Sequence, residues 1–397
     1  MAAIRKRGNS YQIRVSCGYN TSGEQVTKTK TWTPEKDMTP KQIKKELNRQ
    51  AMLFEEECNS GCQPVTMKFQ SFAESWFKEY AEIKLKTQTI RNYHNCEKKV
   101  YKAIGHLRMD KITTRDIQMF IVGLINENRK DRRGKPLKPY SPKTVKNYKT
   151  FISSVFDYSV KMQMLPDNPC RNVVLPKLKQ KERKIYTLEE VQKMLDLFEE
   201  ETEANYKYTI FFTLAAFTGL RRGELLGLEW KDIYWDDSLL KVVRTSEYTK
   251  EKGIYTDTPK TESSKRFIKL PPEIIQKLKE YKAWQDKWKE EVGSKWIESD
   301  RLFTKTDGSP MGMRQPYKYF ERFCARTGMR FVNIHSFRHF NASILINNGV
   351  DVRTVQGCLG HSCATTTLNI YAHTFQEAQA RAMDDIAKCI LYRENEK

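Results

Sequence analysis

The stretch FTGLRRGELLGLEW, residues 217–230, lies where an apolar helix gives way to a charged turn. We expect Gly219 to end that helix, because glycine readily takes the left-handed conformation found just past helix C-termini. Arg221 would then be held by short-range backbone geometry and point into a cleft. Glu224 could pair with this arginine and fix its guanidinium. Otherwise the two form an ordinary surface pair worth a few tenths of a kcal/mol.

A second cluster of basic residues lies in NIHSFRHFNASILINNGV, residues 333–350. His335, Arg338 and His339 stand at positions i, i+3 and i+4, so a helix places all three on one face. Two histidines four residues apart also suggest zinc, but the metalloprotease pattern needs a glutamate after the first histidine, and Ser336 is there instead. A cationic arginine between two histidines suits an anion better, and we expect no metal site.

The third segment is LGHSCATTTLNIYAH, residues 359–373. We expect Gly360 to end a short helix, so that His361 projects from its end. Tyr371 falls in a predicted helix. Its hydroxyl either takes part in chemistry or makes a hydrogen bond in the domain interior, as buried tyrosines usually do.

The composition indicates a polyanionic partner. Seventy lysines and arginines against 49 acidic residues give a net charge of +21 and a pI near 9.4, and nucleic acid is the commonest partner of such chains. No apolar stretch approaches the roughly 18 to 20 residues of a membrane span, and no secretory signal is evident. Nine cysteines without a disulfide or zinc pattern predict reduced thiols in a bacterial cytoplasmic protein.

Residues 1–64 differ from the rest of the chain. SYQIRVS and VTKTKTW alternate in hydropathy around a turn, which predicts a β-hairpin or small three-stranded sheet. A capping box at Thr39 then opens a helix. The sheet either reads DNA through a basic face or is a small folding cap with a basic surface. The candidate DNA-binding residues of this module are Arg14, Lys28 and Lys30.

Residues 65–175 predict four helices joined by basic loops, as in a helical bundle. Serine and threonine caps place helix starts at Ser71, Thr113 and Ser141. Residues 176–184 are rich in lysine and arginine without an apolar period, which predicts an exposed linker. Basic residues of the helices either lie on solvent-facing sides or line a DNA groove, and the candidates are Arg91, Lys98, Lys146 and Lys149.

Residues 185–397 predict a mostly helical domain with one β excursion. The strands are SLLKVVRT (238–245) and SKRFIKLP (264–271), with a polar turn region between them. The fold expected for the chain is therefore multidomain and mainly α: a small N-terminal sheet plus helix, a four-helix domain, and a mixed α+β domain. No GxxxxGK[ST] phosphate-binding loop is present.

Four motifs in this order, TGLRRGEL, HSFRH, LGHS and TLNIYAH, resemble the tyrosine recombinases, the family that includes phage lambda integrase. The resemblance is most specific over residues 184–397, which look like the catalytic domain with its C-terminal tail helix. Residues 65–175 look like the family's core-binding domain. The N-terminal module resembles an arm-type DNA-binding domain, and the whole arrangement is most similar to conjugative-transposon integrases.

By this resemblance, Tyr371 attacks a DNA phosphate, forms a 3′-phosphotyrosyl link and expels a 5′-hydroxyl. Arg221, Arg338 and His361 would donate to the phosphate oxygens, and guanidinium forks suit that task because each grips two oxygens. His335 resembles the family's general base for the phenol, whose ordinary pKa near 10 makes removal of its proton worthwhile.

The resemblance assigns protonation of the leaving oxygen to a lysine in a β-hairpin. Lys260 in PKT matches best, and Lys265 is the alternative. Glu224 matches an acidic position that supports the first arginine. No metal or other cofactor is implied, because two arginines stabilise the charge that metal ions often stabilise in phosphoryl transfer.

The resemblance also implies a function and its partners: integration and excision of a mobile element at core and arm sites of double-stranded DNA. A homotetramer coupled through the C-terminal tail would do this, with an accessory excisionase and DNA-bending proteins. Two alternatives stay open. A type IB topoisomerase shares the phosphotyrosine chemistry, and a catalytically inert DNA-binding regulator would carry the same charge, since phosphate attraction needs no chemistry.

Overall fold

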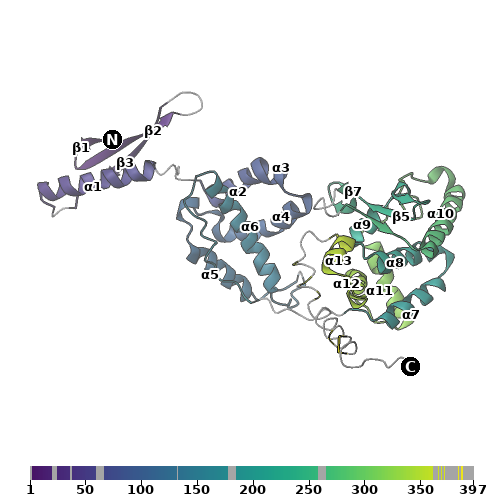
Figure 1. Cartoon of the computed structure of the whole chain (residues 1–397). Coiled ribbons are helices and arrows are strands. Elements are labelled where there is room, and N and C mark those ends of the chain that lie inside the picture. The colour runs from purple at the N-terminus through teal and green to yellow at the C-terminus, as the bar shows by residue number, and fades with distance from the viewer. Residues whose placement is uncertain are drawn as a thin grey trace. The chain divides into compact units, whose positions relative to one another are not determined.

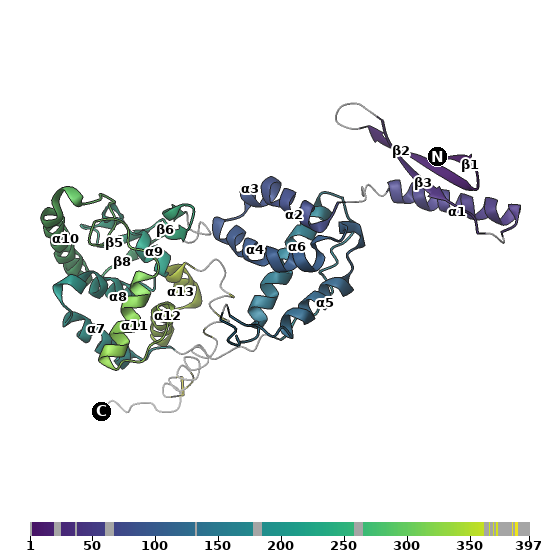
Figure 2. The same cartoon turned by 180° about the vertical axis from the view of Figure 1, so that it is seen from behind.

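The chain folds into two compact units, Met1–Gln180 and Lys181–Lys397, seen from two sides in Figure 1 and Figure 2. Each unit is described by itself. No helix within the described ranges is long and apolar enough to cross a membrane. The computed structural model describes residues 2–19, 25–35, 38–59, 67–131, 133–177, 185–257 and 265–360, and single residues 365, 368, 371, 383, 386 and 387.

The first unit begins with a three-stranded antiparallel sheet and one helix, which confirms the predicted N-terminal sheet. Ile13 and Val15 are buried against Phe54 of the helix, because alternate residues of a strand point to one face. Thr39 caps the helix, and its backbone N–H donates in turn to the side chain of Gln42. The elements are β1 (Ala3–Arg7), β2 (Ser10–Tyr19), β3 (Gln25–Trp32) and α1 (Pro40–Asn59).

The rest of the first unit is helical and shares one aromatic core. Trp76 is fully buried and contacts the rings of Phe77 and Phe151. The predicted helix starts at Thr113 and Ser141 are confirmed, since both side chains accept a hydrogen bond from the backbone three residues on. The elements are α2 (Phe69–Trp76), η1 (Phe77–Ala81), α3 (Glu82–Lys84), α4 (Thr87–Val100), η2 (Tyr101–Gly105), η3 (Met109–Lys111), α5 (Thr114–Ile125) and α6 (Pro142–Lys161).

The predicted helix start at Ser71 is wrong. Helix α2 begins two residues earlier, at Phe69, and no side chain caps it. The Phe69 N–H donates instead to the carbonyl of Leu107 at 2.8 Å, and its ring is fully buried. A partner distant in sequence thus satisfies the helix end that a local cap would otherwise satisfy.

The second unit is built around α8, a helix buried on nearly every side. It contacts α7, α10, α11 and α12, which surround it in Figure 1 and Figure 2. Thr187 caps α7, since its side chain accepts a hydrogen bond from the backbone N–H of Glu190. The helices are α7 (Leu188–Glu199), η4 (Glu203–Asn205), α8 (Tyr206–Thr218), α9 (Arg222–Gly227), η5 (Trp230–Asp232), α10 (Pro272–Val292), η7 (Gly293–Lys295), α11 (Gln315–Thr327), α12 (His335–Asn347) and α13 (Val352–Leu359).

The strands of the second unit correct one expectation. The region predicted as a polar turn contains a further hairpin, in which Ser246 and Thr249 are buried. Helix α9 packs closely on this hairpin: a Cβ on Gly223 would lie 2.4 Å from the Thr245 hydroxyl. The strands are β4 (Ile233–Tyr234), β5 (Leu239–Val242) and β8 (Arg266–Lys269) in one sheet, and β6 (Thr245–Thr249) with β7 (Gly253–Asp257) in the other.

Candidate active site

Gly219 ends α8 as predicted and positions the first arginine. Its φ of 59° is left-handed, and a Cβ there would lie 2.8 Å from the Asn341 side-chain oxygen and 2.9 Å from Leu359. Only glycine fits such a close approach between α8, α12 and α13. The chain then turns so that Arg221 caps α9, with its backbone N–H donating to Glu224 at 3.0 Å.

Glu224 is buried and lies between two guanidinium groups. Arg221 Nη1 donates to Glu224 Oε1 at 2.7 Å, and Arg266 Nη2 donates to Oε2 at 3.0 Å. Burial alone would raise the pKa of this carboxyl, yet the charges of Arg266 and Arg221 hold the pKa below its ordinary value. The predicted pairing of Glu224 with Arg221 is thus present, with the carboxylate buried and the Arg221 side chain 39% exposed.

Arg266 was missed by sequence reasoning. It is the first residue of β8, its side chain is 7% exposed, and its Nε donates to the carbonyl of Cys358 at 2.8 Å. It thereby links β8 to α9, through Glu224, and to the end of α13. Strand alternation could have placed it on the same face as Ile268, but no local signal identifies its two partners.

Arg338 is the deepest basic group of the site, with 1% of the residue exposed. Its Nη1 donates to the carbonyl of Gly219 at 3.0 Å, while its Nη2 is buried without a hydrogen-bond partner among the described residues. Burial, and then repulsion from Arg221, lower the pKa of Arg338 to about 9, so the group is charged at neutral pH. A buried donor left unpaired costs about 1–3 kcal/mol, and a ligand oxygen would remove that cost.

Helix C-termini hold all three guanidinium groups. Arg338 donates to Gly219 at the end of α8, and Arg221 donates at 3.1 Å to Gly360 at the end of α13, next to the Cys358 carbonyl that binds Arg266. Terminal carbonyls lack partners within their own helix and carry the negative end of its dipole, so they suit cations. Among the described residues, three guanidiniums face one carboxylate, and the surplus charge favours an anion.

Tyr371 is 1% exposed and packs with Ala342, Ile346, Val355 and Leu359 of α12 and α13. Its hydroxyl oxygen lies 2.8 Å from Nδ1 of His339. His339 is the residue that follows Arg338 on α12. The hydroxyl of the predicted nucleophile thus contacts the residue next to the predicted arginine Arg338.

Of the other predicted catalytic residues, the structure describes some and not others. The ring of His335 lies one helical turn from that of His339, with centroids 4.9 Å apart. Lys265 is exposed and precedes β8. Lys260 and His361 lie outside the described residues, as does most of the predicted tail. Within the described ranges, no group of three or more metal-binding side chains is found.

The register of the N-terminal sheet separates its candidate DNA-binding residues. Lys28 pairs with Val15 and Lys30 with Ile13, so both lysines lie on the face that packs against α1. Lys30 donates to the Gln50 side chain at 3.3 Å. The open face instead carries arginine and threonine side chains: Arg5, Arg7, Arg14, Thr27, Thr29 and Thr31.

The candidates in the helical domain lie on α4 and α6. Lys98 and Lys146 are exposed, while Arg91 and Lys149 are half-buried. Positions 91 and 98 are seven residues apart, which places them on one side of α4. Their part in DNA binding stays a prediction.

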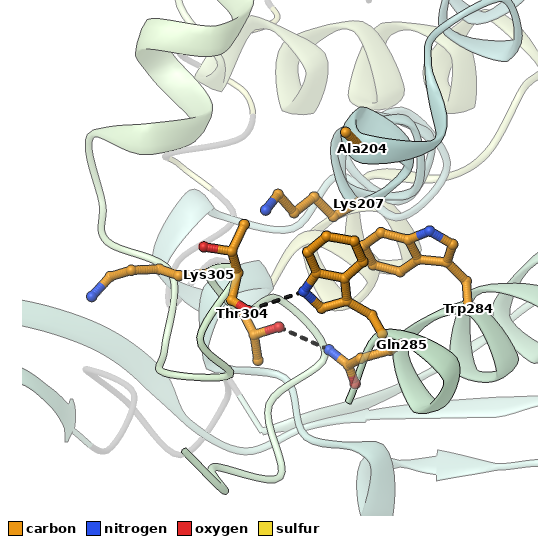
Figure 3. A pocket seen from close by; sticks show the side chains of 8 residues that line it. Ala204, Lys207, Trp284, Gln285, Thr304 and Lys305 are labelled. Carbon is orange, nitrogen blue, oxygen red and sulfur yellow. Dashed lines mark hydrogen bonds between the residues drawn. The ribbon is translucent and has the colours of Figure 1, made fainter. Parts of the chain in front are cut away.

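A small cavity of about 30 Å³ lies elsewhere in the second unit, among Lys207, Trp284 and Trp288 (Figure 3). It has room for a water molecule but none for a nucleotide. Gln285 and the Trp288 indole close its floor through hydrogen bonds to Thr304 and the Thr306 carbonyl. Burial lowers the pKa of Lys207, against an opposing effect of Asp307.

We predict that Lys207→Met raises the melting temperature by about 2–4 °C, because the charged amine is buried at a cost of about 1 kcal/mol. The pKa of Lys207 is lower in the folded state than in the unfolded one, so the cost is fully present at neutral pH, falls once the pH rises past the folded-state pKa, and is gone above the unfolded-state pKa. Calorimetry at pH 7 measures it, with exposed Lys279→Met on α10 as control. A lower melting temperature for Lys207→Met would contradict the assignment.

The chain is similar in sequence to phage integrases. The sequence profile of the phage integrase family matches residues 184–378, and that of the phage integrase N-terminal SAM-like domain matches residues 68–125. The ICEBs1 integrase of Bacillus subtilis is 31% identical over 62% of this chain and 66% of its own length. The integrase of Staphylococcus phage L54a is 24% identical over 82% of this chain and 94% of its own.

Two solved structures share the fold at low identity. A fragment of the Tn1549 transposon integrase, in complex with transposon right-end DNA, superposes with a TM-score of 0.66 and 21% identity over 81% of this chain and all of that one. A lambda integrase tetramer bound to a Holliday junction gives a TM-score of 0.51 and 19% identity over 92% of this chain and 94% of that one. The family predicted from the four motifs is thus confirmed, and the chain belongs to the phage integrase family of tyrosine recombinases.

Proposed function

We propose that the protein is a site-specific DNA recombinase that integrates and excises a mobile element by cutting and rejoining strands through a 3′-phosphotyrosyl intermediate. One observation carries this proposal. Arg338 keeps a buried donor without a described partner, while the next residue of α12 binds the hydroxyl of Tyr371. Arg338 and His339 are consecutive residues, so a group that can bind an anion lies next to the group that contacts the nucleophile, and attack on a phosphodiester requires both close together.

The reaction follows from this arrangement. Tyr371 Oη attacks the phosphorus and the bond between phosphorus and the 5′-oxygen breaks. The 3′-phosphate is then linked covalently to Tyr371, and the other strand end carries a 5′-hydroxyl. Arg221 and Arg338, with His361, donate to the non-bridging oxygens, whose charge rises in the transition state. Because one phosphoester replaces another, a second 5′-hydroxyl reverses the step on a new strand without ATP. No metal or cofactor enters the scheme.

Proton transfers complete the exchange. A hairpin lysine, Lys260 or Lys265, protonates the leaving 5′-oxygen. The resemblance assigns removal of the phenol proton to His335, whose ring lies against that of His339. Glu224, whose side chain is buried, keeps Arg221 in place by an ion pair of 2.7 Å.

The test separates recombination from both alternatives. A supercoiled plasmid carrying the two ends of the element is incubated with the protein. We expect junction products that join the two ends, formed only when both sites are present. Relaxation of any plasmid without joining would support a type IB topoisomerase, and binding without a covalent complex on a nicked site would support an inert regulator.

The N-terminal sheet is proposed to bind arm sites, distant from the crossover, through its open face. Arg14 lies on that face and donates to the Thr27 hydroxyl at 3.3 Å. Binding two DNA segments at once would raise affinity through effective concentration. The open face, rather than the face with Lys28 and Lys30, is the one available to a groove.

We predict that Arg14→Ala weakens binding to element-end DNA about tenfold, the usual effect of losing one base or phosphate contact. Lys30→Ala is the matched control and should change affinity less than about twofold, because its amine is engaged with Gln50 and lies near the Phe54 ring. Fluorescence anisotropy of the full chain at fixed salt measures both. A larger loss for the lysine variant would place DNA on the opposite face.

A homotetramer on core sites, coupled through the segment after Tyr371, completes the proposal, with an excisionase and DNA-bending proteins as accessory partners. The protein would act in the bacterial cytoplasm, on the nucleoid. A chain that ends at Thr374 should bind single sites normally but form fewer tetrameric complexes, measured by native gel. Unchanged tetramers and strand exchange from this truncated chain would exclude the tail's role.

A further inference from the structure

The hydroxyl of Tyr371 shares a hydrogen bond with His339, a histidine to which the sequence motifs assign no role. His339 follows Arg338 directly, and its Nδ1 lies 2.8 Å from the Tyr371 hydroxyl oxygen. The histidine predicted as general base, His335, lies one turn earlier and meets His339 edge to face, at 84° between ring planes.

The hydrogen bond between His339 and Tyr371 lies in a buried, apolar environment. The tyrosine ring is seated among apolar side chains of α12 and α13, including Ala342 and Leu359. His339 is 7% exposed and Tyr371 1% exposed. Because water is largely excluded from these buried side chains, it does not compete for the hydrogen bond between His339 and Tyr371.

We propose that His339 is a catalytic residue that takes the phenol proton during cleavage and returns it during joining, a role that rests on the proposed recombinase function. Neutral imidazole with its proton on Nε2 leaves the Nδ1 lone pair facing the hydroxyl. As the bond from Tyr371 Oη to phosphorus forms and the bond to the 5′-oxygen breaks, the proton passes from Oη to Nδ1. The hairpin lysine gives a separate proton to the leaving oxygen.

The phosphate-binding group and the proposed proton acceptor lie on the same helix, α12. Arg338 and His339 are consecutive residues of α12, so the group that binds the phosphate and the group that receives the proton keep a constant spacing. Arg338 itself is held by the Gly219 carbonyl. The imidazolium formed during cleavage also adds a positive charge close to the phosphate when that phosphate is most negative.

The test is single-turnover cleavage of a nicked element-end oligonucleotide by the full chain. His339→Asn is the informative variant, because its amide can still bond the phenol near the Nδ1 position but cannot take a proton. His335→Asn tests the competing candidate one turn earlier on the same helix, the histidine to which the resemblance assigns the phenol proton. A second substrate carries sulfur at the 5′-bridging position, and that leaving group needs no proton donor.

We expect His339→Asn to cleave at least about 100-fold more slowly than the unchanged chain, the usual effect of losing a general base, with DNA affinity within twofold. The defect should persist on the sulfur substrate, whereas Lys260→Ala should recover there. Melting temperature and DNA binding establish that the variant is folded, and His339→Gln replaces it if it is not.

Three results would overturn the role. Cleavage by His339→Asn within threefold of the unchanged chain would reduce His339 to holding the ring. Recovery of His339→Asn on the sulfur substrate would mean that His339 protonates the leaving group. A 100-fold loss confined to His335→Asn would mean that His335 is the residue that takes the phenol proton. Failure of the unchanged chain to form any covalent complex would instead refute the recombinase function itself, and this role with it.

Discussion

Tyr371→Phe should reduce the covalent protein–DNA complex to below detection while DNA affinity stays within about twofold. The variant loses the nucleophilic oxygen, and it keeps the basic groups that bind phosphate. It should lose about 1 kcal/mol of stability with the hydrogen bond to His339, or about 2–4 °C in melting temperature. The measurement is a denaturing gel of labelled, nicked element-end DNA after incubation with excess protein.

Tyr281→Phe is the matched control for this experiment. Tyr281 is fully buried in the same unit, and its hydroxyl donates to the Leu302 carbonyl at 2.7 Å. Its loss should lower stability by a similar amount and leave cleavage unchanged. A covalent band from the Tyr371 variant at the level of the control would place the nucleophile elsewhere in the chain.

Arg338→Met should slow cleavage about 1,000-fold, the usual effect of losing one preorganised donor to a transition-state oxyanion. Its stability should stay within about 1 kcal/mol of the unchanged chain or rise. The reason is that a buried, incompletely paired charge is expensive, so that a hydrophobic side chain of similar size replaces it at little cost. Single-turnover cleavage and calorimetry on the same samples measure the two effects.

Arg301→Met provides the opposite case. Arg301 is 6% exposed, but its guanidinium is paired, with donors to the Gly227 carbonyl and the Thr256 hydroxyl at 2.5 Å each and with Glu229 nearby. Removing it leaves the buried Gly227 carbonyl without this donor and the nearly buried Glu229 without this charge, so we expect a loss of about 3 kcal/mol, or roughly 6–12 °C. If Arg338→Met were as destabilising as Arg301→Met, its open donor would not be a functional feature.

Short-range sequence signals were sufficient for much of the fold. Thr113, Ser141 and Thr187 mark true helix starts because each cap bonds a backbone group three residues away. Gly219 and Gly360 end their helices in the left-handed conformation, which is a property of glycine itself. The motifs around them also identified the family, since motif order and spacing are properties of the chain alone.

Contacts between distant segments account for the failures. The helix at Phe69 needs no cap because Leu107 supplies the acceptor, and the hairpin after β5 buries polar residues against the glycines of α9. Strand register, which no local pattern specifies, turned Lys28 and Lys30 toward the helix.

The sequence by itself determined the family and the helix boundaries set by caps and glycines, and it predicted Arg221, Arg338 and Tyr371 as site residues. Only the tertiary structure decided how they work together: that Arg266 shares Glu224 with Arg221, and that His339 binds the phenol. The physical reason is that two histidines on one helix face are equivalent in sequence. Packing from α12 and α13 determines which of them the Tyr371 hydroxyl meets.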